Sequence, residues 1–434
     1  MTAISPSICD LAEVAISQPP DFQTRYLDPV EHLDFTDEEC RHHLLFEHYR
    51  FPNLRTISLA FSGYNNDFTL VPYLQPKLER LHFYGGPITD ATLARLLTCC
   101  PVLRELIIEN PLYTCCSSEG FRMYLDGVRS LSSLELRCGK GDAAIANVFL
   151  SLAQSSILRT LDFRITIDVE LMSRALEDRR RLSNPNPSLF ADLKKLVCVA
   201  TYPAITMLLP HLTKLTYLEV SIKGKEALDL FSQLCRFRLQ LRVLKIEYLC
   251  SYPVMINPAM MLEFVQKRCW DIEELVVSGK EACGTGFSRP VFKLLERAGS
   301  LRHLRLSLKC DLTEVTLLVA AKYAGKRLVE LDIHGTFDSD RLTKLFADMG
   351  FSFGKQFRFL SIGTISIPRF ENDIEELRPK AEAFAHLLKT IFPMLEDFNV
   401  SDSNDFSKMV ESELMEMLED ARSIYQKIQM DPAS

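Results

Sequence analysis

Residues 100–110 read CPVLRELIIEN, and the apolar spacing in this stretch decides the fold. Leu103, Leu106 and Ile108 follow the order apolar, two residues, apolar, one residue, apolar. A mean step of about 28 residues between such copies is within the range of leucine-rich repeats. The spacing occurs thirteen times, starting at Leu54, Leu78, Leu103, Leu131, Leu158, Leu193, Leu215, Leu241, Ile272, Leu301, Leu328, Phe357 and Leu395.

The segments between these copies have the pattern of amphipathic helices. In residues 88–100, Thr89 or Asp90 can cap a helix with one apolar stripe. In residues 257–269, Asn257 is a candidate cap and Pro258 suits the first helical position. Neither a short strand nor such a helix can bury its apolar face alone, so neighbouring repeats must stack.

The predicted fold class is therefore α/β. We expect a leucine-rich-repeat solenoid of about 13 repeats, with a curved parallel sheet on the concave face and helices on the convex face. Residues 51–401 form the predicted solenoid, residues 1–50 an N-terminal capping segment and residues 402–434 a C-terminal helical cap. The slot three residues before the first strand leucine, occupied by Cys100 and Cys269, is predicted to be a buried packing position.

Composition and charge narrow the function. The net charge of −7 gives no general electrostatic reason to bind nucleic acid or anionic lipid. No secretory signal and no run of eighteen apolar residues occurs, so we expect a soluble protein without membrane partners, located in the cytoplasm or the nucleus. The thirteen cysteines include no CxxC pair, and no phosphate-loop, dinucleotide, zinc-protease or hydrolase motif occurs. We therefore expect no metal, no cofactor, no catalytic residues and no enzyme activity.

The stretch TDATLARLLTCCPVLRELIIEN resembles the cysteine-containing repeat of F-box/leucine-rich-repeat proteins. The variable repeat length is similar to that of fungal members of this family. The resemblance implies that the repeat domain holds a substrate, while a separate helical F-box docks the Skp1 subunit of a cullin ubiquitin ligase. Residues 1–50 depart from the family pattern, because they lack its Leu-Pro opening, so we interpret this segment as a degenerate or absent F-box.

Outward positions of the predicted strands give a hypothesis for partner binding. Residues that alternate with the buried leucines point away from the helices, and in repeats six to nine they combine valines, an aromatic ring and both charges. A second cluster places Arg80, His82 and Tyr84 opposite Glu105 and Glu109. The alternative is that these valines only reflect strand propensity. The predicted partner-binding residues are Val197, Val199, Tyr217, Glu219, Val243, Lys245, Glu247, Glu274 and Val276.

These observations predict a non-enzymatic protein-protein interaction scaffold that binds its partner on the concave face. One alternative is the substrate receptor of a Skp1-cullin-F-box ubiquitin ligase, with Skp1 and a cullin as partners. A further alternative is an enzyme regulator or inhibitor. Burying the predicted apolar patch would contribute on the order of 5 kcal/mol, while association costs roughly 4–15 kcal/mol. Charged neighbours must therefore contribute to binding.

Overall fold

The chain divides after Leu215 into two compact units, which are described separately. Unit 1 comprises residues 1–215 and unit 2 comprises residues 216–434. The computed structural model describes residues 23–36, 46, 49–60, 67–85, 88–109, 114–115, 117–137, 143–181, 189–224, 230–237, 239–350, 352–366, 374–401 and 404–430.

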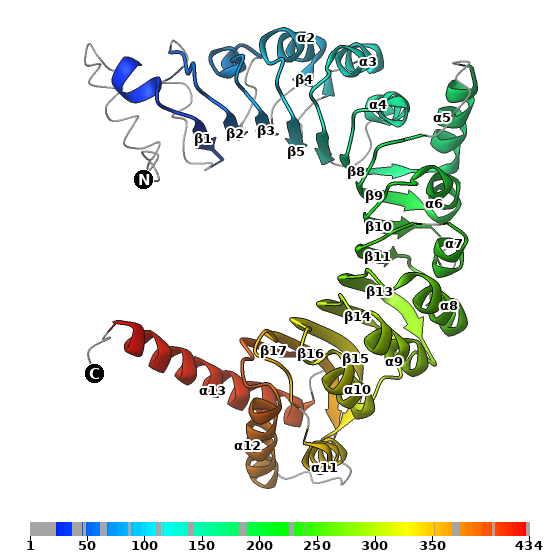
Figure 1. The fold of residues 1–434 in the computed structure, drawn as a ribbon, viewed down its shortest axis with the longest axis vertical. Coiled ribbons are helices and arrows are strands. Elements are labelled where there is room, and N and C mark those ends of the chain that lie inside the picture. Colours follow the sequence, from blue (N-terminus) through cyan, green and yellow to red (C-terminus); the bar gives the residue numbers. More distant parts are fainter. Residues whose placement is uncertain are drawn as a thin grey trace. The chain divides into compact units, whose positions relative to one another are not determined.

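Unit 1 is an open sheet of parallel strands with helices on one face (Figure 1). A small second sheet pairs β4 (Ile88–Thr89) with β6 (Thr114–Cys115). In order across the main sheet, its strands are β1 (His32–Phe35), β2 (Thr56–Ala60), β3 (Arg80–Tyr84), β5 (Glu105–Glu109), β7 (Ser133–Arg137), β8 (Thr160–Ile167) and β9 (Lys195–Thr201). Its helices are η1 (Gln23–Leu27), η3 (Asp67–Tyr73), α2 (Asp90–Cys99), α3 (Ser118–Gly127), α4 (Ala143–Gln154), α5 (Val169–Arg181), α6 (Tyr202–Leu208) and η4 (Leu209–His211).

Unit 2 repeats the same plan. A short strand, β12 (Val254–Met255), pairs with the far end of β13. The main strands are β10 (Tyr217–Lys223), β11 (Val243–Leu249), β13 (Glu274–Gly284), β14 (His303–Cys310), β15 (Glu330–Asp338), β16 (Phe359–Ser366) and β17 (Asp397–Val400). The helices are α7 (Phe231–Arg236), α8 (Pro258–Arg268), α9 (Ser288–Arg297), α10 (Glu314–Ala324), α11 (Ser339–Met349), α12 (Ile374–Ile391) and α13 (Asp405–Met430).

The repeating apolar residues form the core between sheet and helices. Leu103, Leu106 and Ile108 are at most 3% exposed, and the corresponding residues of the other predicted copies are also buried. The register aligns these positions between strands, so that Leu81 lies beside Leu106 and Leu106 beside Leu134. The predicted α/β class and leucine-rich-repeat solenoid are confirmed.

The helix ends follow the predicted capping chemistry. The Thr89 hydroxyl accepts a hydrogen bond from the Thr92 amide at 3.1 Å, and the Asn257 side chain accepts one from the Ala259 amide at 2.9 Å. Pro258 is the first residue of α8, where a missing amide hydrogen costs nothing. These caps fix where α2 and α8 begin.

The cysteine slot at the helix-to-strand turn is buried, as predicted. Cys100 and Cys269 are at most 1% exposed. Burial raises the pKa of the Cys100 thiol from 9.0 to about 12 and that of Cys269 to about 11. Both thiols are therefore protonated at neutral pH, which suits packing and not nucleophilic chemistry.

The parallel sheet begins before residue 51, the predicted start of the repeats. Strand β1 lies within the predicted capping segment and pairs with β2, placing Leu33 beside Ile57 and Phe35 beside Leu59. Val30, Leu33 and Phe35 have the same spacing as the thirteen predicted copies and are at most 7% exposed. Residues 30–35 thus add a fourteenth copy.

At the other end, α13 covers the last strands of unit 2. It packs along α12 and against β16 and β17. Phe406, Val410, Leu414 and Leu418 form its buried stripe. This helix occupies most of the predicted C-terminal cap.

Candidate partner-binding faces

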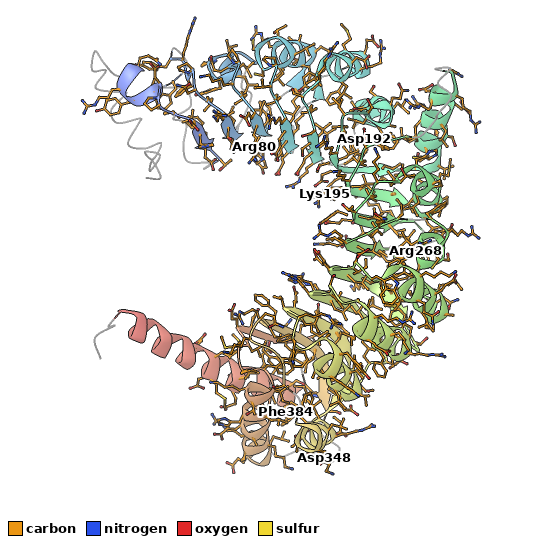
Figure 2. All side chains as sticks on the ribbon, in the orientation of Figure 1. Arg80, Asp192, Lys195, Arg268, Asp348 and Phe384 are labelled. Atoms are coloured by element: carbon orange, nitrogen blue, oxygen red, sulfur yellow. The ribbon has the colours of Figure 1, made fainter. Side chains whose placement is uncertain are left out.

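Each main strand presents alternate residues to the face that the helices leave open. In β10 the burial pattern alternates between buried and partly exposed residues along most of the strand. This alternation follows from the period of two in a strand, because the leucines turn toward the helices. We call the opposite side the strand face. Figure 2 shows side chains that extend from this face, including Arg80 and Lys195 in unit 1.

In unit 2 the predicted residues come together on three neighbouring strands. The register places Tyr217, Val243 and Glu274 side by side, and next to them Glu219, Lys245 and Val276. Glu247 is exposed and the others are partly exposed. We call these seven residues the strand-face cluster: Tyr217, Glu219, Val243, Lys245, Glu247, Glu274 and Val276.

Polar contacts fix the side chains of the strand-face cluster. The Tyr217 hydroxyl donates a hydrogen bond to Glu219 at 2.8 Å. The Lys245 ammonium lies 5.8 Å from the centroid of the Tyr217 ring and 2.8 Å from a carboxylate oxygen of Glu274. Ser221 donates a hydrogen bond to Glu247 at 2.7 Å. An aromatic ring and a cation are thus held in place beside two partly exposed valines.

The two predicted partner-binding residues in unit 1, Val197 and Val199, differ in their exposure to solvent. Val199 is partly exposed, but Val197 is only 6% exposed, so its predicted place on an accessible patch is wrong. Val197 lies directly beside Asp162 of β8, and that carboxylate is bound by the guanidinium groups of Arg137 at 3.2 Å and Arg164 at 3.1 Å. Long side chains therefore crowd the strand face next to Val197.

A ladder of ion pairs crosses the strand face of unit 1. Arg80 lies 3.3 Å from Glu105, and His82 lies 3.6 Å from Glu109, so the predicted opposition of these residues is confirmed. Tyr84 lies beside Glu109 in the register.

Arg137, which was not predicted from the sequence, links carboxylates of three neighbouring strands. It contacts Glu109 and Glu135 at 2.6 Å and Asp162 at 3.2 Å. Burial alone would lower the pKa of Arg137, but the carboxylates of Glu135, Glu109 and Asp162 outweigh this effect and raise it. The guanidinium group is therefore a permanent positive charge that orders three strands.

A second polar group in unit 2 also escaped the sequence analysis. Glu330 binds Arg305 and accepts a contact from His303 at 3.1 Å, while Ser307 donates to Asp332 at 2.8 Å. Beside them, Phe359 is 40% exposed at the start of β16. These residues occupy the same outward positions of their strands as the strand-face cluster. The alternation of buried and outward residues along each strand therefore predicts them as well.

Neither a metal-binding cluster nor a membrane-spanning helix is found in the part of the chain that the structure describes. Among the described residues, no three His, Cys, Asp or Glu side chains are placed to hold a metal ion. No described helix is long and apolar enough to cross a lipid bilayer. Eight of the described cysteines form no disulfide bond: Cys99, Cys100, Cys198, Cys235, Cys250, Cys269, Cys283 and Cys310.

Comparisons with known proteins agree with the repeat architecture. Residues 22–142, from η1 past β7, match the family model described as "FBD-associated F-box protein At5g56370, LRR repeats". The match includes β1, and so also places the first repeat before residue 51. A search of curated proteins found no match.

Two solved structures illustrate how distant the similar folds are. The complex of Rad7 and Elc1 in yeast matches with 14% identity and a TM-score of 0.45, covering 79% of this chain and 81% of that chain. The leucine-rich repeat-containing protein LegL7 from Legionella pneumophila matches with 9% identity and a TM-score of 0.26, covering 83% and 97%. The chain is thus similar, over residues 22–142, to the leucine-rich repeats of F-box-associated proteins.

Proposed function

We propose that this protein is a non-enzymatic interaction scaffold that binds a protein partner on the strand face of unit 2. The observation that carries the proposal is the strand-face cluster, in which Tyr217 and Lys245 are held in fixed positions beside Val243 and Val276. Protein interfaces combine such an aromatic anchor with a polar rim. A tyrosine that is already oriented loses little side-chain entropy on binding.

The energetics require the charged residues to take part. Tyr217, Val243 and Val276 are already partly covered, so burying the rest contributes on the order of 1 kcal/mol each. That sum is below the roughly 4–15 kcal/mol that association costs. Glu219, Glu247 and Glu274 give the cluster an excess of negative charge over Lys245 alone. We therefore expect the partner to present basic side chains around an apolar centre.

The second candidate is the substrate receptor of a ubiquitin ligase. It is supported by the match of residues 22–142 to repeats of an F-box-associated family. In this proposal the repeats are of the type found in fungal F-box/leucine-rich-repeat proteins, and Skp1 docks outside the sheet. Residues 32–35 belong to the sheet, which removes them from any F-box. Direct binding of purified Skp1 to the full chain, measured by calorimetry, tests this candidate independently of the strand face.

The test of the scaffold compares two double variants in affinity purification from the native cell. The test variant, Tyr217→Ala with Val243→Glu, alters the strand-face cluster. The control variant, Tyr323→Ala with Val169→Glu, changes the same residue types at exposed positions on the helices α10 and α5. Both variants are first shown to melt cooperatively near the wild-type temperature.

We expect partners that are retained by the wild type and the control but lost by the test variant. Such a partner is then expressed and its affinity for each purified chain is measured. A partner set that is identical for all three chains would contradict the proposal, because binding would then not depend on the strand face. Turnover of a captured partner by the purified chain alone would contradict the non-enzymatic part.

A further inference from the structure

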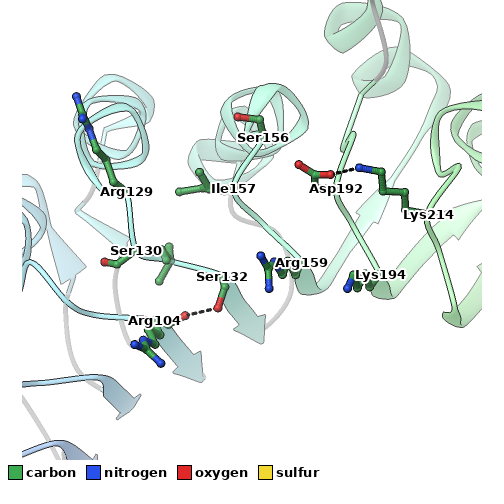
Figure 3. A pocket seen from close by; sticks show the side chains of 11 residues that line it. Arg104, Arg129, Ser130, Ser132, Ser156, Ile157, Arg159, Asp192, Lys194 and Lys214 are labelled. Atoms are coloured by element: carbon green, nitrogen blue, oxygen red, sulfur yellow. Dashed lines mark hydrogen bonds and ion pairs between the residues drawn. The ribbon is translucent and has the colours of Figure 1, made fainter.

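A basic pocket lies in unit 1 where the chain turns from helices into strands. Its volume is about 750 Å³, within the range of small-molecule sites. Figure 3 shows Arg104, Arg159 and Lys194 at the starts of their strands, with Asp192 and Lys214 on one side. Arg129 lines another part of the wall. Five cationic side chains and one carboxylate thus line this pocket, in a protein whose net charge is −7.

Backbone hydrogen bonds place the strand-start residues in a row. The amide of Ser132 donates to the Arg104 carbonyl at 2.9 Å, that of Arg159 to Ser132 at 2.8 Å, and that of Lys194 to Arg159 at 2.8 Å. Neighbouring strands are about 4.8 Å apart. Arg104 and Arg159 therefore begin about 10 Å apart, with Lys194 one strand further along.

Elsewhere in the same row, three arginines form ion pairs with acids. Earlier in unit 1, Arg55 occupies the equivalent position and forms an ion pair with Glu79 at 2.7 Å. In unit 2, Arg242 pairs with Glu273, and Arg358 pairs with Glu396 at 2.7 Å. Between Arg104 and Lys194 the row contains Ser132 and Arg159, and no acid.

The pocket arginines are left without acidic partners. Arg104, Arg129 and Arg159 form no ion pair with any acid among the residues that the structure describes. The single carboxylate, Asp192, is bound by Lys214. Lys214, and more weakly Arg159 and Lys194, lower the pKa of Asp192, which reports a positive local potential.

The hydroxyl groups of the pocket are partly committed to the backbone. Ser130 donates to the carbonyl oxygens of Pro101 and Leu103 at 2.9 and 2.8 Å. Ser132 lies 3.3 Å from the carbonyl oxygen of Arg104. Recognition therefore depends on guanidinium and ammonium groups, which match the geometry of phosphate oxygens.

We propose that this pocket binds an anion carrying at least two phosphate groups, held by Arg104 and Arg159 with Lys194 beside them. Two guanidinium groups about 10 Å apart at their origins are long and flexible enough to converge on one oligophosphate or on two phosphates in sequence. The same chemistry is available from a free oligophosphate and from a phosphorylated segment of a protein. The proposal does not depend on partner binding at the strand face, since the pocket residues precede the strands.

The experiment uses the full chain and isothermal titration calorimetry at about 0.15 M salt, where weak surface electrostatics are screened. The probes are inorganic tripolyphosphate, a doubly phosphorylated serine peptide and the same peptide without phosphate. The test variant is Arg104→Gln with Arg159→Gln. The control variant, Arg242→Gln with Arg302→Gln, removes two arginines from the equivalent row of unit 2. Circular dichroism confirms that both variants are folded.

We expect the wild type and the control to bind a phosphate-bearing probe equally. The test variant should bind at least about a hundredfold more weakly, or about tenfold for each charge-assisted hydrogen-bond donor removed. Binding of tripolyphosphate but not of the peptide assigns the site to a free oligophosphate, and the reverse result assigns it to a phosphorylated protein. Absence of binding to both probes, or equal weakening in both variants, would overturn the proposal.

Discussion

The Nζ atom of Lys245 on β11 lies 2.8 Å from a carboxylate oxygen of Glu274 on β13 and 5.8 Å from the ring centroid of Tyr217 on β10. One side chain thus contacts the strands on both sides of its own. The side chains of Lys245 and Glu274 remain 30% and 23% exposed. Ion pairs with such access to water contribute about 0–1 kcal/mol to stability. The contact therefore serves mainly to orient the strand-face cluster.

We predict that Lys245→Met separates binding from stability. The free energy of unfolding should change by less than about 1 kcal/mol, while partner affinity falls because Tyr217 and Glu274 lose their common neighbour. Urea denaturation measures the first quantity and calorimetry with the captured partner the second. Lys267→Met is the matched control, because Lys267 pairs with Glu263 at 2.6 Å on α8, away from the strand face. Equal loss of affinity in both variants would contradict the orienting role of Lys245.

Strand β1 provides a test of where the solenoid begins. Phe35 is 1% exposed, and its ring lies 6.1 Å from that of Phe46 and 5.8 Å from that of Tyr73. Because Phe35→Ala removes a large side chain from a packed cluster, we expect it to destabilise unit 1 by about 3–5 kcal/mol. Urea denaturation followed by tyrosine fluorescence measures the change. His32→Ala, at an exposed position of the same strand, is the control. Equal stability of both variants would indicate that residues 32–35 are only an appended segment.

The fold was largely predictable from the sequence because one short spacing repeats. Each repeat has apolar residues at the positions of Leu103, Leu106 and Ile108, so periodicity alone locates the strands. The copy at Val30, Leu33 and Phe35 has the same spacing but was missed, because residues 1–50, which contain it, were interpreted as a capping segment.

The surface was less predictable, because it depends on neighbours that lie about 28 residues away in the sequence. The crowding around Val197 depends on Arg137, which reaches Asp162 from the neighbouring strand β7 and joins Arg164 of β8 there. The basic pocket had a signal, since Arg104, Arg159 and Lys194 occupy the same position of their repeats. The signal becomes visible only when the repeats are aligned. The charge of the residue that directly follows the first leucine of the spacing can then be compared between repeats.

Buried thiols predict a loss of stability at alkaline pH. Burial raises the pKa of Cys100 to about 12 and that of Cys269 to about 11, from an ordinary 9.0. Above pH 9 the unfolded chain releases these protons while the folded chain keeps them. Their contribution to stability is therefore complete below pH 9 and is lost as the pH rises through the range from 9 to about 11–12.

The expected loss is roughly 1 kcal/mol per thiol by pH 10. Cys100→Ala with Cys269→Ala should therefore show a smaller difference in free energy of unfolding between pH 7.5 and pH 10 than the wild type. Urea denaturation under reducing conditions measures this difference. Cys99→Ala with Cys235→Ala, at partly exposed positions, is the control. If the control reduces the pH dependence as much as the test variant, the buried thiols are not its source.

Two glycines allow the backbones of β15 and β16 to approach each other. A Cβ atom on Gly363 would overlap the backbone oxygen and nitrogen of Gly335. A Cβ atom on Gly335 would overlap the carbonyl oxygen of Leu312. The register between the two strands shifts at this point, between Ile333 and Thr336. Close packing of main chains at the shift therefore excludes any side chain.

We predict that Gly363→Ala destabilises unit 2 by at least about 1–3 kcal/mol, the usual cost of overpacking, because two backbones must separate. Gly299→Ala is the matched control, since nothing lies within 4 Å of its added Cβ atom. Urea denaturation measures both variants, and amide hydrogen exchange locates the change, which should concentrate in β15 and β16. Equal stability of the two variants would contradict this prediction. It would mean that β15 and β16 can move apart without a loss of stability, so that the missing side chains of Gly335 and Gly363 do not fix the register.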